Sequence, residues 1–171
     1  MNITPQEVGS FFLTLIVPIV TGVAAAWFTA RFALNRFYHE KWWEKKHTAY
    51  SQLIDDLIEI KKIYSQAYGF FEITYNLGKG QKRPKDYVEW SQLNRLYVNI
   101  RRHYALAQIS LSKNSEGLLR NFFEQQDLLE NNLIMGTMPE FEAYHQMIGE
   151  TERLIKSIVI DAGRELKFGK M

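Results

Sequence analysis

Two short motifs in this sequence carry residue types that bind transition metals. Each is a glutamate followed three positions later by a histidine, Glu44 with His47 and Glu142 with His145. Helical bundles that hold two metal ions use this motif on two facing helices, together with an inward glutamate from each of the other two. The other glutamates that could take this part mostly fall on polar helix faces: Glu89, Glu116, Glu124 and Glu130. We therefore expect neither a metal nor a cofactor.

Nucleophilic and phosphate chemistry also lack a signature. The chain has no cysteine, which excludes a thiol nucleophile and a thiolate metal site. It has no Walker-type run ending in Gly-Lys-Ser or Gly-Lys-Thr, no GxGxxG and no GxSxG elbow. We expect a non-enzymatic protein, and a metal-dependent enzyme is the alternative.

Basic side chains form two groups that could bind an anion or an acidic partner. One group lies in a turn rich in glycine and proline, and the other on an expected helix: Lys79, Lys82, Arg83 and Lys85, then Arg101 and Arg102. The competing interpretation is an ordinary solvated loop and helix face. The loop group could also contact nucleic acid, but the solvated loop is the favoured interpretation, so nucleic acid is not an expected partner.

An apolar run near the N-terminus determines where the rest of the protein is placed in the cell. Val8 to Ala30 form 23 consecutive residues without a charge. As a helix they would be about 35 Å long, against about 30 Å of bilayer hydrocarbon. A cleaved signal peptide and a buried core helix are the alternatives. A signal peptide begins with basic residues, whereas the residues before this run include Glu7 and no Lys or Arg. We expect a transmembrane anchor over residues 1–34 and a cytoplasmic domain over residues 35–171.

The charges around this run predict its orientation. Five basic residues follow the run within about sixteen positions and none precedes it, so the C-terminal domain should be cytoplasmic and the N-terminus outside, as expected for a bacterial inner membrane. The expected interfacial anchors are aromatic and basic residues at this boundary: Trp27, Arg31, Arg36, Trp42, Trp43, Lys45 and Lys46.

Small residues recur every fourth position along the run. They are Ser10, Thr14, Pro18, Gly22, Ala26 and Ala30, and we call them the small-residue ridge. Such a ridge lets two membrane helices approach closely, which predicts a homo-oligomer or a larger complex. The other interpretation is that small residues are simply common in membrane helices.

The rest of the sequence predicts four amphipathic helices joined by short turns. Apolar residues alternate three and four apart through the segments ending near Asn76, Ser112, Leu133 and Ala162. Asp86 should cap the second helix, Asn114 or Ser115 should begin the third, and Thr137 with Glu140 has the spacing of a capping box for the fourth. The predicted fold is all-α: one transmembrane helix that continues into an antiparallel four-helix bundle.

Residues 31–57, RFALNRFYHEKWWEKKHTAYSQLIDDL, resemble a segment of small single-pass bacterial membrane proteins. In these proteins a span is followed by a helix with paired tryptophans, Glu-Lys-Lys and an Ala-Tyr-x-x-Leu-Ile run. Some accompany phage-defence systems such as retrons as membrane effectors. The resemblance implies a membrane-anchored protein that acts through protein-protein interaction, either as a membrane-perturbing effector or as a passive tether, with the bilayer as one partner.

Overall fold

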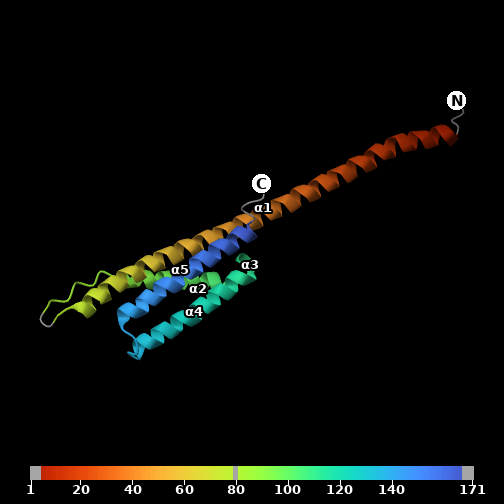
Figure 1. The fold of residues 1–171 in the computed structure, drawn as a ribbon. Helices are drawn as coiled ribbons and strands as arrows, with labels where there is room; N and C mark the ends of the chain where they lie inside the picture. The colour runs from red at the N-terminus through yellow and green to blue at the C-terminus, as the bar shows by residue number, and fades with distance from the viewer. Residues whose placement is uncertain (1–4, 79–80, 167–171) are drawn as a thin grey trace. The chain divides into compact units, whose positions relative to one another are not determined.

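The computed structural model describes the backbone of residues 5–78 and 81–166, and the side chains of Thr14, 16–78 and 81–166. This part of the chain is all-helical, which confirms the predicted class. The helices are α1 (Pro5–Asn76), α2 (Trp90–Ala105), α3 (Ala107–Ser110), α4 (Lys113–Ile134) and α5 (Glu140–Glu165) (Figure 1). The chain divides into two compact units, Met1–Glu44 and Lys45–Met171. The second unit begins at Lys45, ten residues after the expected start at residue 35, and Lys46 is the first buried side chain among those described in α1.

The first unit exposes its apolar side chains. Every residue from 16 to 44 is exposed, and large side chains such as Ile19 and Phe32 are 56% and 71% exposed. Within the described residues, α1 is the one helix long and apolar enough to cross a membrane. A core helix of a soluble domain buries its apolar side chains, so that interpretation does not fit this segment.

The second unit is built on the later part of α1. The positions predicted to face its core are nearly inaccessible: Tyr50, Leu53, Leu57, Ile60, Tyr64 and Ala67. They recur three and four residues apart, which is why one face of a single helix can bury them all. Figure 1 shows α2 and α5 beside this part of α1, and α4 beside α5.

In the contacts between α1 and α5, residue numbers that rise along α1 pair with residue numbers that fall along α5. Lys46 pairs with Glu165, Lys61 with Glu152, and the Tyr75 ring contacts Phe141. Contacts of α1 with α2 do the same, from Asp56 with His103 to Phe71 with Trp90. Within the second unit, α1 therefore lies antiparallel to α5 and to α2.

The second helix begins later than predicted. Asp86 does not cap it, because α2 starts at Trp90 and its N-cap residue is Glu89. Asp86 instead accepts hydrogen bonds from the Val88 amide (2.9 Å) and the Trp90 indole (3.0 Å). Its carboxylate thus orders the segment before α2. The helix also breaks at Leu106, so the predicted single helix up to Ser112 is α2 followed by the short α3.

The fourth predicted helix lacks its capping box. α5 begins at Glu140, with Pro139 as the N-cap residue and no side-chain cap. The Thr137 hydroxyl donates to the Asn132 carbonyl (3.2 Å) and so closes the preceding turn, in which Gly136 has φ of 64°. Thr137 lies two residues before the N-cap position, which Pro139 occupies with an extended backbone, so neither the expected capping box nor the expected early helical position of Pro139 is formed.

Candidate membrane segment and buried polar sites

The small-residue ridge has open space at its centre. A Cβ atom added at Gly22 would meet nothing within 4 Å. Ala26 and Ala30 are exposed, as is Thr14. The side chain of Ser10 lies outside the described residues. The neighbouring Thr21 and Thr29 hydroxyls donate to backbone carbonyls of α1, those of Val17 and Ala25, at 2.8 Å, so both donors are paired within the helix.

The expected anchors divide between the two units. Trp27, Trp42 and Trp43 are exposed aromatic side chains, and Arg31 and Lys45 are exposed too. Arg36 pairs with Glu40 at 2.9 Å. Such exposed rings and cations suit the boundary between hydrocarbon and water.

Lys46 differs from the other expected anchors. It is only 6% exposed, and its ammonium contacts the Glu165 carboxylate at 2.5 Å. Its position is inside the second unit, where it ties α1 to α5, so the structure corrects the expectation of an anchor that faces the membrane surface.

A buried carboxylate joins three helices close to Lys46. Asp161 of α5 accepts hydrogen bonds from Ser115 (2.5 Å), Tyr50 (3.2 Å), Asn114 (3.1 Å) and Ser112. Burial by itself would raise the pKa of Asp161, but these four hydrogen bonds outweigh it and the pKa is lowered. The ionised carboxylate is therefore the form that holds α1, α4 and α5 together.

One of these donors also starts a helix. Ser112 is the N-cap of α4, and its hydroxyl oxygen accepts from the Ser115 amide at 2.9 Å. The same hydroxyl donates to Asp161. The backbone amide of Ser112 donates to the Tyr50 hydroxyl at 3.1 Å. The start of α4 is thereby fixed to both α1 and α5.

A second polar group lies midway along the second unit. The tyrosine hydroxyls of Tyr64 and Tyr97 each donate to Gln126 Oε1 at 2.9 Å, and they contact each other. Gln126 is 1% exposed, and its Nε2 has no hydrogen-bond partner in the structure. An unpaired buried amide lowers the stability of the fold by about 1–3 kcal/mol. This nitrogen is therefore a hydrogen-bond donor that still lacks an acceptor.

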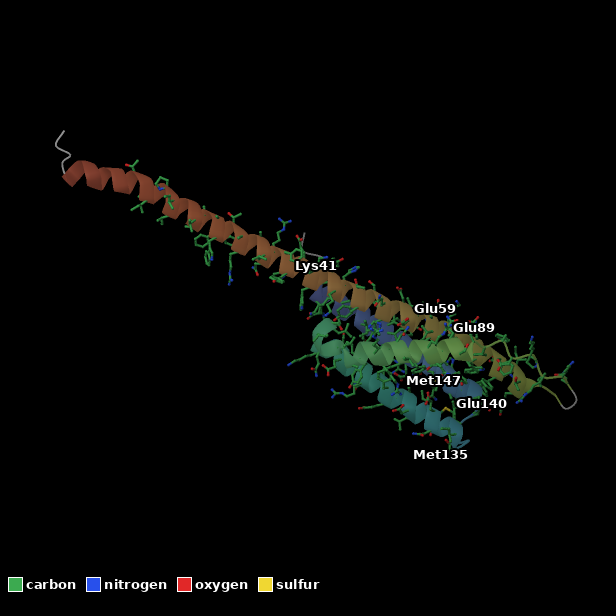
Figure 2. All side chains as sticks on the ribbon, turned by 180° about the vertical axis from the view of Figure 1, so that it is seen from behind. Lys41, Glu59, Glu89, Met135, Glu140 and Met147 are labelled. Carbon is green, nitrogen blue, oxygen red and sulfur yellow. The ribbon has the colours of Figure 1, made fainter. Side chains whose placement is uncertain are left out.

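This group borders a cleft of about 190 Å³ between helices. Its walls come from α1, α2, α4 and α5, and they include Phe123, Tyr144 and Met147 as well as the charged Arg101, Asp127 and Glu130. Figure 2 labels Met147 on α5. The Arg101 guanidinium lies 5.3 Å from the centre of the Phe123 ring, a cation–π contact at one wall.

Burial changes the pKa of the titrating groups around the cleft, although Glu130 itself lies on the exposed rim. Burial raises the pKa of Tyr144 to about 12, and it raises the pKa of Tyr64 and of Tyr97 further above the ordinary value. Burial, and then the nearby Asp127, raise the pKa of Glu130, whereas Arg101 opposes them. The three hydroxyls are therefore neutral donors and acceptors at neutral pH.

The two expected groups of basic side chains lie apart in the structure. Lys82, Arg83 and Lys85 are exposed in the segment before α2, and Lys79 lies outside the described residues. Arg101 lines the cleft, and Arg102 is exposed three turns into α2. About 16 Å of helix separates Arg101 from the start of α2.

The two Glu-x-x-His motifs are not brought together. His47 follows Lys46, which pairs with Glu165 where α1 enters the second unit, whereas the His145 ring centre lies 5.5 Å from that of Tyr68 in a tilted arrangement. Twenty-one residues of helix, about 31 Å, separate positions 47 and 68 of α1. Among the described residues, no three His, Asp or Glu side chains group as a metal site would need.

Asp161 and Gln126 were not identified from the sequence. The available signal was their spacing, since both polar residues occur at positions where the helical period calls for a buried side chain. No protein family, curated protein or solved structure matches this chain.

Proposed function

We propose that this chain is a single-pass membrane protein whose cytoplasmic antiparallel four-helix bundle acts through protein-protein interaction. The observation that carries the proposal is the uncharged run from Val8 to Ala30, whose described side chains are all exposed. Apolar surface of that extent needs lipid or protein around it, and the length suits a bilayer. The basic residues after the run favour an outside N-terminus and a cytoplasmic bundle in a bacterial inner membrane.

The contacts of α1 with α2 and α5, together with those of α4, support the bundle. Ser115 at the start of α4 meets Asp161 near the end of α5, and Tyr104 of α2 meets Phe123 of α4 at 5.6 Å between ring centres. Sequential helices joined by short turns and paired in opposite directions are the up-and-down bundle topology.

The protein could act as a membrane-perturbing effector or as a passive tether. Of these two roles we propose the effector, whose self-association in the membrane perturbs the bilayer. α1 has no helix break from Pro5 to Asn76, so the helix that crosses the membrane also supplies core residues of the bundle. A partner that binds the bundle can then control the separation of neighbouring spans. A passive tether would use the same anchor without this coupling.

The experiment expresses the full chain alone in a bacterial host and follows growth and a membrane-potential dye. Gly22→Ile adds bulk at the centre of the ridge, while Ala24→Ile adds it on the opposite face of the helix and serves as the matched control. We expect depolarisation with the wild type and with Ala24→Ile, and at least about tenfold weaker crosslinking and depolarisation with Gly22→Ile, since close packing needs the small residue.

Unimpaired growth and potential at high membrane expression would favour the passive tether. Equal crosslinking of the two variants would show that the ridge is not the contact surface.

A further inference from the structure

The cleft bordered by Gln126 has one buried polar atom, Gln126 Nε2, that no described residue pairs with. Gln126 Nε2 is a buried donor without an acceptor, because both hydrogen bonds to this side chain go to its Oε1. Glu130 lies four residues further along α4, hence on the same helix face, and it is an acceptor at the cleft wall. A molecule seated here meets the acceptor at the wall, and it reaches the Gln126 donor once a tyrosine side chain above that nitrogen rotates.

The walls restrict the shape of such a molecule. Tyr64, Tyr97, Tyr144 and Phe123 supply aromatic surface, and Leu93, Leu133 and Met147 supply aliphatic surface. Aromatic walls favour a planar ring. The volume of about 190 Å³ suits one ring or a fused pair rather than a nucleotide or a peptide.

The charges restrict its chemistry. Asp127 and Glu130 outnumber Arg101 in the lining, and Arg101 already covers the Phe123 ring. A phosphate or carboxylate would be repelled by this excess of negative charge. A neutral ring with a carbonyl oxygen beside an N–H group satisfies both Gln126 and Glu130.

We propose that this cleft is a binding site for a small, neutral, planar lactam or carboxamide. Its carbonyl oxygen accepts from Gln126 Nε2 after a rotation of the half-buried Tyr97 or Tyr144 side chain, and its N–H group donates to Glu130. The site lies wholly within the second unit, so the proposal stands independently of membrane insertion and of the effector role.

The test uses the full chain in detergent and titrates uracil and nicotinamide as probes, with binding followed by saturation-transfer NMR. Uridine monophosphate tests the exclusion of phosphate, and choline tests a cation held by the aromatic walls. We expect saturable binding of uracil or nicotinamide in the millimolar range or tighter, and none of the other two, because a ring of this size gains only a few kcal/mol.

Gln126→Met keeps the length of the side chain but removes the donor, and Gln125→Met changes the exposed neighbour as its matched control. The first should weaken binding by at least about tenfold, the effect of one lost buried hydrogen bond, and the second should leave binding unchanged. Glu130→Gln, on the exposed rim, should weaken binding severalfold without changing the thermal midpoint of unfolding. If Gln126→Met does not fold, unchanged binding in Glu130→Gln overturns the proposal.

The proposal is overturned if neither probe binds saturably up to about 10 mM, a limit set by the smallest useful affinity for so few atoms. It is also overturned if binding is the same in Gln126→Met and Gln125→Met, or if choline or the monophosphate binds in place of the neutral rings.

Discussion

Asp161 shows how one side chain can decide the packing of several helices. Its carboxylate is 5% exposed and accepts from donors on α1, on α4 and at the α4 N-cap. A buried acceptor with this many partners is expensive to remove, because each donor then loses a hydrogen bond in a place that water reaches poorly.

We expect Asp161→Asn to lower the free energy of unfolding by about 1–3 kcal/mol at neutral pH, since an amide accepts fewer hydrogen bonds than a carboxylate. The pKa of Asp161 is lowered in the folded protein, so its stabilisation is complete above the ordinary aspartate pKa of about 4 and is lost as the pH falls further. The difference between wild type and variant should therefore shrink from pH 6 to pH 3.

Urea unfolding followed by circular dichroism measures this difference, with the exposed Asp55→Asn as the matched control. A constant difference across the pH range would show that the lost contacts involve packing and not the charge of Asp161.

At the scale of the element, α4 and α5 start in different ways. α4 begins at Lys113 with Ser112 as its N-cap, slightly before the predicted start at Asn114 or Ser115. The Ser112 hydroxyl caps α4, whereas Thr137 closes the turn before α5, whose N-cap residue is Pro139 without a side-chain cap. We expect Ser112→Ala to cost about 1–2 kcal/mol, the range for a lost N-cap. Thr137→Ala should cost less than about 0.5 kcal/mol, as for an exposed side chain.

The same unfolding titration measures both variants. A larger loss for Thr137→Ala than for Ser112→Ala would contradict the assignment of the caps.

The elements themselves could be predicted because the helical period is strong throughout. Leu53, Leu57 and Ile60 follow it and are buried as predicted. The helix starts were less accessible to prediction, since Asp86, Ser112 and Thr137 all have capping side chains and only the folded chain decides which backbone amide each one meets.

The polar sites could not be derived from the sequence for a related reason. Asp161 and Gln126 acquire their roles from partners 29 to 111 residues away along the chain, such as Tyr97 for Gln126 and Tyr50 for Asp161. Local patterns contain no information about such pairs until the register between the helices is known.

At the scale of the whole molecule, the central claim is that α1 crosses a membrane with its N-terminus outside. Its most direct test is a pair of single-cysteine variants, Asn2→Cys and Lys170→Cys, in a chain that has no cysteine of its own. Intact cells are treated with a membrane-impermeant thiol reagent, and the protein is then isolated from the carbonate-washed membrane fraction. We predict labelling of position 2 in intact cells and of position 170 only after the inner membrane is permeabilised. Recovery of the protein in the soluble fraction, or labelling of position 170 but not of position 2, would contradict the claim.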